Sequence, residues 1–268
     1  GDKGNYGVEY VLRDVLEGRD GKARRQRIAR GFYGRLVGGD NSEPEDGLDV
    51  VTTLDLEMQD VADRALRRQL EAQNALWGTA LVMEVATGDL LAMANLSRTK
   101  SGAYAEVKNH ALSSRMEPGS TFKLAALLAL VDDAGMSLDE TFDTGNGARV
   151  KVGRTTVQDS HGLPPLNLKD AVAHSSNVFF ARAVYETYKD DPERYVDYLR
   201  HLHLDRTVGL EEFGAVAPIF PAPGMKIWYP DVSIVNMGYG YAIELTPLHT
   251  LTLYNAVAND GCMVAPRL

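Results

Sequence analysis

Residues 117–123 read Glu-Pro-Gly-Ser-Thr-Phe-Lys and run directly into residues 124–131, Leu-Ala-Ala-Leu-Leu-Ala-Leu-Val. The Pro-Gly pair predicts a loop that leads the chain into a helix, with Ser120 at the start of that helix. Lys123 follows three residues later, so its amine is placed on the same helical face as the serine hydroxyl. The apolar run behind it predicts a buried helix. A serine beside a lysine at the edge of a hydrophobic core pairs a nucleophile with a base, which suggests covalent acyl transfer.

Lys123 can act as a base only if its pKa is lowered. At the ordinary lysine pKa near 10.4, about one side chain in a few thousand is neutral at pH 7. The apolar helix behind Lys123 supplies desolvation, which disfavours the charged form. We therefore expect a lowered pKa for this lysine.

A second Ser-x-x-Lys spacing occurs at Ser97 and Lys100. It follows a predicted strand and lies in a polar stretch. No apolar helix would therefore bury its lysine, and no helix N-terminus would point at its serine. We interpret this second match as accidental and Ser120 as the nucleophile.

The triplet Ser175-Ser176-Asn177 lies between two predicted helices. On a turn, Ser175 and Asn177 project to the same side while Ser176 points elsewhere. Ser175 would then relay a proton between Lys123 and a leaving group, and Asn177 would hold a substrate amide by two-sided hydrogen bonding. An ordinary helix-capping cluster is the alternative for such a triplet alone. Its pairing with the serine–lysine element favours the catalytic interpretation.

The rest of the chain predicts an early group of strands followed mostly by helices. A helix is expected from the capping residue Asp55 to about Leu70, and these apolar residues are predicted to share its inner side: Met58, Val61, Ala62, Ala65 and Leu66. Residues 48–53 are expected to form a strand, and residues 79–85 and 90–95 a β-hairpin. A later helix begins at Thr246-Pro247, and it is predicted to turn four residues inward: Leu248, Leu251, Tyr254 and Val257.

Composition limits the classes of function. With 268 residues, of which 44% are hydrophobic and 24% charged, the chain can bury a substantial core. The net charge of −9 argues against a nucleic-acid partner, and the basic residues within 22–30 are interpreted as a solvated face. Cys262 is the only cysteine, so an internal disulfide is excluded. His201 and His203 have no third ligand in the sequence nearby, so neither a metal nor a cofactor is expected. No apolar stretch reaches the roughly 20 residues that span a bilayer.

The two motifs together resemble those of active-site serine penicillin-recognising enzymes, which carry S-x-x-K, then S-x-N, then K-[ST]-G. Residues 4–18 resemble the end of the non-catalytic domain of class B penicillin-binding proteins. Further stretches are similar to transpeptidase-domain landmarks: Asp55 with Gln59, the Gly88 hairpin, residues 159–162, and residues 238–240 with 245–247. The resemblance covers essentially the whole chain.

This resemblance implies an α+β fold of the β-lactamase/transpeptidase type, with a helical subdomain and an antiparallel sheet covered by helices. Residues 1–48 would be a remnant of the N-terminal non-catalytic domain and its linker, with the turn-rich stretch 38–47 at the boundary. Residues 49–268 would be a transpeptidase domain truncated at its C-terminus, its sheet incomplete because the C-terminal strands are absent. The third motif is expected beyond Leu268, since residues 100–102, Lys-Ser-Gly, match its letters but precede Ser120.

The implied function is a peptidoglycan D,D-transpeptidase that cross-links stem peptides through a Ser120 acyl-enzyme and is acylated by β-lactams. Ser120, Lys123 and Ser175 would be catalytic, and Asn177 would bind substrate. The resemblance also implies a membrane glycosyltransferase partner and a place on the extracytoplasmic (periplasmic) side of the cell membrane, with the anchor outside this chain. Three alternatives stay open: a serine β-lactamase, a β-lactam sensor domain and a non-catalytic cell-wall scaffold.

Overall fold

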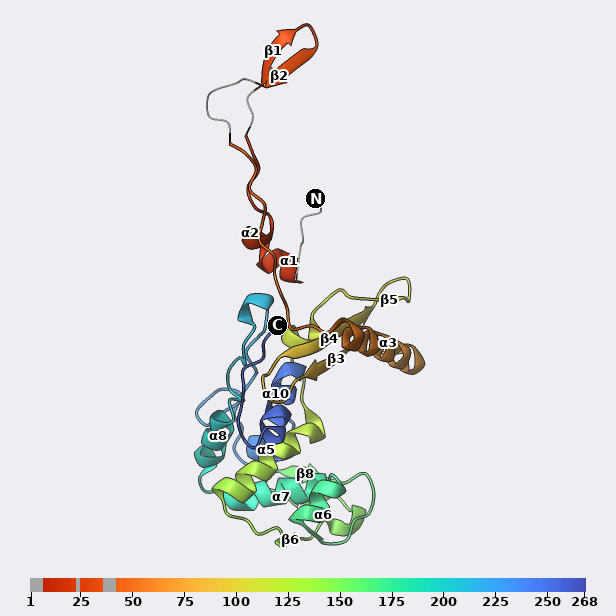
Figure 1. Ribbon diagram of the computed structural model, residues 1–268. Helices are drawn as coiled ribbons and strands as arrows, with labels where there is room; N and C mark the ends of the chain where they lie inside the picture. Colours follow the sequence, from red (N-terminus) through yellow and green to blue (C-terminus); the bar gives the residue numbers. More distant parts are fainter. Residues whose placement is uncertain (1–6, 23–24, 36–41) are drawn as a thin grey trace. The chain divides into compact units, whose positions relative to one another are not determined.

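The computed structural model describes residues 7–22, 25–35 and 42–268, and the chain divides into two compact units, 1–52 and 53–268. Within its described residues, the first unit holds helices α1 (Gly7–Val11) and α2 (Arg13–Leu16) and the antiparallel strands β1 (Arg25–Ala29) and β2 (Phe32–Arg35) (Figure 1). Parts of three sequence interpretations lie outside the described residues: 4–6 of the family-like stretch, 23–24 of the basic cluster and 38–41 of the turn-rich segment.

The second unit contains an antiparallel sheet in the order β3 (Trp77–Met83), β4 (Leu90–Arg98) and β5 (Tyr104–Ala105). The predicted hairpin is therefore confirmed, with Gly88 at positive φ in its turn. Alternate residues of β4 face opposite sides of the sheet: Ala94 packs toward helix α3 (Leu56–Gln73), whereas the Asn95 side chain accepts a hydrogen bond from the amide of Ala111 in α4 (His110–Ser113) at 2.9 Å. Because both faces of β4 are covered, the strand is buried almost throughout.

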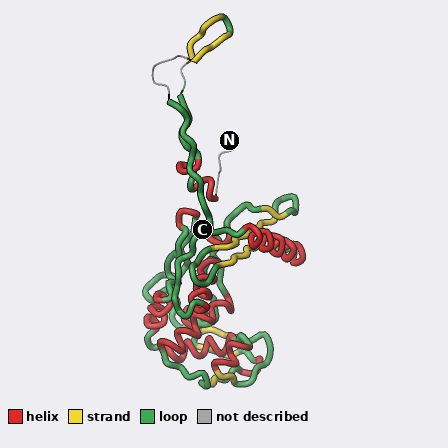
Figure 2. The backbone as a smooth tube through the Cα atoms, viewed as in Figure 1, coloured by secondary structure: helices red, strands yellow, loops and turns green. Residues whose placement is uncertain are grey.

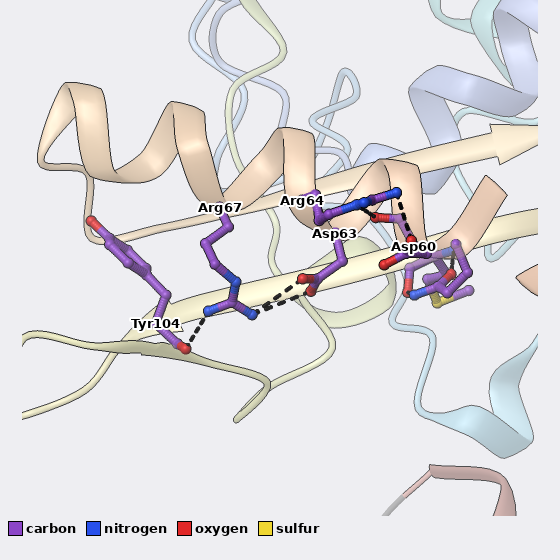
Figure 3. A network of polar contacts seen from close by, with 7 residues as sticks. Asp60, Asp63, Arg64, Arg67 and Tyr104 are labelled. Carbon is purple, nitrogen blue, oxygen red and sulfur yellow. Dashed lines mark hydrogen bonds and ion pairs between the residues drawn. The ribbon is translucent and has the colours of Figure 1, made fainter. Parts of the chain in front are cut away.

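Helix α3 is fastened to the sheet by polar contacts as well as by packing. The Gln59 side chain donates to the Met93 carbonyl at 3.2 Å and accepts from the Met93 amide at 2.7 Å, as a neighbouring strand would. Further along the helix, Arg67 donates to the Tyr104 carbonyl at 2.7 Å and pairs with Asp63 one turn earlier (Figure 3). These contacts hold the helix on one face of β4 and β5.

The prediction for α3 is correct in its extent and its cap, since Asp55 accepts a hydrogen bond from the Met58 amide at 2.9 Å. It is partly right about the buried face. Ala62 and Leu66 pack against the sheet as predicted, whereas the other three residues predicted to face inward are exposed: Met58, Val61 and Ala65. Apolar residues occupy two adjacent stripes of this helix, so the period alone did not show that only one of them is buried.

The predicted strand at residues 48–53 is also wrong. The segment is irregular, and of its residues only Thr53 reaches the sheet, where its hydroxyl donates to the Leu90 carbonyl at 2.8 Å. Strand β4 already has β3 on one edge and β5 on the other. Strand β5 pairs only with the end of β4, at Ser97 and Arg98, and the start of β4 is bonded instead by the Thr53 hydroxyl and the Asp55 amide.

In the second unit, more residues lie in helices than in strands (Figure 2). The predicted core helix consists of the 3₁₀ turn η1 (Gly119–Phe122), α5 (Lys123–Leu128) and the π turn η2 (Ala129–Asp133), and it packs against α7 (Asn177–Tyr188) in the main core. The remaining helical elements are α6 (Leu168–Ala173), α8 (Pro192–His201), α9 (Ser233–Met237), α10 (Pro247–Ala258), η3 (Gly145–Gly147) and η4 (Glu211–Phe213). Two strand pairs complete the unit: β6 (Thr141–Phe142) with β9 (Leu166–Asn167), and β7 (Val150–Val152) with β8 (Thr155–Val157).

Helix α10 begins at Pro247 as predicted, but the Thr246 side chain does not cap it, because that hydroxyl pairs with His249 Nδ1 at 2.7 Å. Two of the residues predicted to face inward are exposed, at 43% and 45%: Tyr254 and Val257. The sequence of α10 is apolar on nearly every side. The spacing of its apolar residues therefore did not define a single buried face.

Candidate active site

Ser120 and Lys123 lie at the start of the buried helix, where η1 passes into α5. A 3₁₀ turn has three residues per turn, so side chains at positions i and i+3 lie directly above one another. This tighter winding places the Lys123 amine over the serine hydroxyl, and Nζ lies 3.1 Å from Ser120 Oγ. Ser120 is exposed, whereas Lys123 is only 6% exposed. The predicted nucleophile is therefore accessible, and its predicted base is buried.

The Lys123 amine is the point at which all four residues proposed from the sequence meet. Besides Ser120 Oγ, it contacts the Ser175 carbonyl oxygen at 2.6 Å, Ser175 Oγ at 3.1 Å and Asn177 Oδ1 at 2.6 Å. An ammonium has three donors, so these four acceptors share its protons. The two motifs are more than fifty residues apart in the sequence, and the lysine joins them into one site.

Burial lowers the pKa of Lys123 to about 8, and the negative charge of Asp159 opposes this effect. The lowered pKa expected from the sequence is thus confirmed, with desolvation as its main cause. At a pKa of about 8, roughly one lysine in ten is neutral at pH 7. That fraction is several hundred times larger than for an ordinary lysine and provides a usable base.

The Ser175–Asn177 turn has an unusual backbone. Ser175 adopts φ of +52°, a left-handed conformation that costs a residue other than glycine about 1–2 kcal/mol. The turn ends α6, because the Ser175 amide donates to the Val172 carbonyl at 3.1 Å and the Ser176 amide donates to the Ala171 carbonyl at 3.0 Å. This conformation presents both oxygens of Ser175 to Lys123 and buries Ser176 completely. Strained backbone of this kind is concentrated at functional sites.

The segment that follows α9 supports the loop ahead of the nucleophile. The Gly119 amide donates to the Gly240 carbonyl at 2.9 Å, and Met116 and Leu245 exchange both backbone hydrogen bonds at 2.9 Å. Gly240 has φ of +93°, and a Cβ added there would overlap the Gly119 carbonyl oxygen. Sequence reasoning used residues 238–240 only as a landmark, and this supporting contact depends on the tertiary fold.

We expect the substitution Gly240→Ala to displace the loop that carries Ser120. Backbone overlap adds to the strain of a positive φ, so the free energy of unfolding should fall by more than about 3 kcal/mol. The matched control is Gly224→Ala, because Gly224 has φ of +83° and open space around its Cβ position. The control should lose only about 1–2 kcal/mol. Urea denaturation measures both, and equal losses would show that the contact with Gly119 is unimportant.

A depression of about 260 Å³ adjoins the site, and its lining residues are Glu117, Asn177, Asn236, Tyr239 and Tyr241. Asn177 Oδ1 accepts from Lys123, so the group that remains for a ligand is its NH₂ donor. Glu117 is fixed at the rim because its carboxylate accepts from the Ala242 amide at 3.0 Å. The depression therefore offers an amide donor, a carboxylate and aromatic rings near the predicted nucleophile, Ser120.

The other polar candidates in the sequence lie elsewhere. Ser97 Oγ pairs with His110 Nε2 at 2.8 Å rather than with Lys100, which is exposed in the loop before β5. This contact supports the interpretation of the second Ser-x-x-Lys spacing as accidental. In the part of the chain that the structure describes, no three His, Cys, Asp or Glu side chains gather as metal ligands would. Over the same residues, no helix combines the length and apolar character needed to cross a bilayer.

Comparison with known proteins assigns the chain to a family. The profile of the penicillin-binding protein transpeptidase domain matches residues 78–268. The chain belongs to the penicillin-binding protein transpeptidase family. The class B membership and the α+β fold class predicted from the motifs are confirmed.

Two curated members of the family align with nearly the whole chain. The probable peptidoglycan D,D-transpeptidase PenA of Neisseria meningitidis is 27% identical over 98% of this chain and 45% of its own length. Penicillin-binding protein PbpB of Mycobacterium tuberculosis is 30% identical over 99% of this chain and 39% of its own length. The chain thus spans less than half the length of these relatives.

Among solved structures, penicillin-binding protein 3 of Mycobacterium tuberculosis complexed with aztreonam matches with a TM-score of 0.79 and 27% identity. The match covers 98% of this chain and 55% of that protein. Nearly all of the fold described above is therefore shared with that protein.

Proposed function

We propose that the protein is a peptidoglycan D,D-transpeptidase that cross-links stem peptides through a Ser120 acyl-enzyme, and that β-lactams acylate the same hydroxyl. The observation that carries this proposal is the buried Lys123 amine, which contacts Ser120 Oγ, Ser175 Oγ and Asn177 Oδ1 together. The names of the relatives support the reaction class, since PenA is called a probable peptidoglycan D,D-transpeptidase. The aztreonam complex of the Mycobacterium tuberculosis protein supports β-lactam binding.

The geometry supports the following acylation. Neutral Lys123 takes the hydroxyl proton of Ser120 as Oγ forms a bond to the carbonyl carbon of the penultimate D-alanine. The amide of Ser120, at the first turn of a helix, donates to the developing oxyanion. Ser175 then passes a proton from Lys123 to the nitrogen of the terminal D-alanine, the C–N bond breaks, and D-alanine leaves.

Transfer to the acceptor reverses these roles. The amine of a neighbouring stem peptide attacks the ester carbonyl, and its surplus proton passes through Ser175 and Lys123 to the departing Ser120 oxygen. The Asn177 amide NH₂ holds a carbonyl of the substrate during both steps. The products are a new peptide bond and the free serine, so every proton taken in the first half is returned in the second.

A β-lactamase would need a base that activates water for deacylation. Asp159 is the carboxylate whose charge acts on Lys123, and it is buried and already accepts three hydrogen bonds. It is therefore poorly placed to activate water, and the carboxylate at the rim of the depression, Glu117, is held by the Ala242 amide at 3.0 Å. The engagement of both carboxylates favours a long-lived acyl-enzyme. Such a lifetime distinguishes a transpeptidase from a lactamase, and intact Ser120 and Lys123 argue against a non-catalytic scaffold.

The proposal extends to the setting of the protein. Residues 49–268 would belong to the transpeptidase domain and residues 1–48 to the end of the preceding non-catalytic domain. The domain would act on the extracytoplasmic side of the cell membrane, where stem peptides are cross-linked. A membrane glycosyltransferase would be its partner, because cross-linking requires the glycan strands that such an enzyme polymerises.

We expect the isolated 268-residue chain to be acylated slowly. Downstream of Asn177 it contains no Lys-Ser-Gly or Lys-Thr-Gly triplet, the motif that supplies the second oxyanion donor in this family. Loss of one oxyanion donor typically lowers the rate about a hundredfold to a thousandfold. Labelling by a fluorescent penicillin, compared with the full encoded protein, measures the difference. Rapid stoichiometric labelling of the isolated chain would contradict this expectation.

A further inference from the structure

Asp159 is a buried carboxylate that the acylation steps above do not use. It follows β8 and is only 6% exposed. One of its oxygens accepts from Ser176 Oγ at 2.8 Å, and the other accepts from the backbone amides of Asn177 at 2.5 Å and Val178 at 3.1 Å. Its hydrogen bonds therefore fall on the turn that presents Ser175 and Asn177 to Lys123, and on the residue after it.

Helix capping alone does not explain a buried charge at this position. Ser176 already caps α7 with a neutral side chain, because its Oγ accepts from the Phe179 amide at 3.0 Å. Burying a carboxylate is costly unless it is well hydrogen-bonded or paired. Asp159 forms no ion pair within 4.0 Å with any lysine, arginine or histidine that the structure describes. The burial of its charge is therefore compensated by the three hydrogen bonds from residues 176–178.

The charge of Asp159 acts on the catalytic lysine. Burial lowers the pKa of Lys123, and the Asp159 carboxylate raises it again toward the ordinary value. Among the described residues, Asp159 is the charged side chain that raises the pKa of Lys123. The groups that contact Lys123 Nζ are neutral: Ser120, Ser175, Asn177 and the Phe180 ring. When Lys123 is protonated, its amine donates to Ser175 and Asn177, which are the two ends of the turn. Asp159 accepts hydrogen bonds from Ser176 and Asn177 of the same turn.

We propose that Asp159 is a positioning residue of the acylation machinery, whose carboxylate holds the Ser175–Asn177 turn against Lys123 and whose negative charge acts on the Lys123 amine. The proposal rests on the function proposed above. Its two parts have separate consequences. Loss of the hydrogen bonds displaces Ser175 and Asn177, whereas loss of the charge leaves Lys123 neutral at a lower pH.

The substitution Asp159→Asn keeps the shape of the side chain but removes the charge and one of the two acceptor oxygens, so it affects both parts, and the pH profile shows them separately as a midpoint and a limiting rate. The test compares the rate constant for acylation by benzylpenicillin from pH 5.5 to 10 in the full encoded protein and in the variant. We expect the midpoint of the rise in rate to move to lower pH. The limiting rate at high pH should fall on the order of tenfold to a hundredfold, as for a misplaced catalytic group.

The control is Asp191→Asn. Asp191 caps α8 by accepting from the Arg194 amide at 3.4 Å, so the same chemical change is made at a helix that does not bond to Lys123. This variant should lose thermal stability without any shift in the pH midpoint. The charge-preserving variant Asp159→Glu should restore the midpoint toward that of the native protein. An Asp159→Asn profile with an unchanged midpoint would reduce Asp159 to a helix cap and overturn the proposal.

A readout independent of activity separates this proposal from the proposed function. The Lys123 signal in protein labelled with ¹³C at lysine Cε, assigned with the variant Lys123→Arg, reports its pKa directly. The midpoint should be lower in Asp159→Asn than in the native protein whether or not either is acylated. Native protein that titrates as expected but captures no penicillin would refute the proposed function alone. Identical lysine midpoints would refute the role of Asp159 alone.

Discussion

Replacing Ser120 with alanine is expected to abolish covalent capture of benzylpenicillin by the full encoded protein, and with it peptide cross-linking. The hydroxyl is the atom that forms the ester, and the alanine methyl offers nothing in its place. Loss of a nucleophile that acts as a unit with its base lowers the rate on the order of a millionfold. Mass spectrometry of the intact protein after incubation with penicillin measures the adduct directly.

The chain provides its own control for this experiment. Ser97 stands in the other Ser-x-x-Lys spacing, and its hydroxyl is engaged with His110 rather than with a lysine. The variant Ser97→Ala should therefore retain the adduct at the native level. A penicillin adduct that persists in Ser120→Ala would assign the nucleophile to another residue and remove the basis of the proposed function.

The centre of the site was predictable because its key relation is local. Ser120 and Lys123 are one helical turn apart, so their proximity follows from the period of the helix without any tertiary information. The hairpin was predictable for the same reason, since its turn lies between two strand-like runs. The alternation in Ser175-Ser176-Asn177 also predicted that the outer residues share one side and that Ser176 points elsewhere, as the structure has it.

The supports of the site were not predictable, because they join distant segments. The Gly240 carbonyl accepts from the Gly119 amide, and the Asp159 carboxylate accepts from Ser176 in the Ser175–Asn177 turn. No sequence period links the two members of either pair. The buried face of α3 was predicted too broadly for a related reason. Where a helix has two apolar stripes, the partner decides which is buried, and the partner here is β4, which presents small residues such as Ala94 to the helix.

The left-handed conformation of Ser175 illustrates how function and local preference diverge. Glycine is the ordinary residue at such a position after a helix, since it adopts positive φ without strain. A glycine here would lack the hydroxyl that contacts Lys123 at 3.1 Å. The sequence therefore shows no glycine at the one residue of the turn that has positive φ. The conformational free energy that this backbone costs is compensated by the contacts of the neighbouring residues.

The substitution Lys123→Met is expected to cause a large loss of the rate of acylation by penicillin. Methionine preserves the length and apolar character of the side chain but removes the amine that contacts Ser120, Ser175 and Asn177. Without a base, the serine must lose its proton to water, and general-base catalysis of this kind contributes about a hundredfold to ten-thousandfold. Acylation by penicillin should fall by at least that factor, whereas the exposed Lys100, changed in the same way, should leave the rate unchanged.

The pH dependence of the native protein tests the same lysine without a substitution. The neutral amine is the active form and the pKa of Lys123 is about 8, so the acylation rate should rise with pH through that value. From pH 7 to pH 9 the neutral fraction grows from about one tenth to about nine tenths, which predicts a roughly ninefold increase. In Lys123→Met the rise centred near pH 8 should disappear. A native rate that is flat from pH 6 to pH 9 would show that the lysine is not the group that accepts the serine proton.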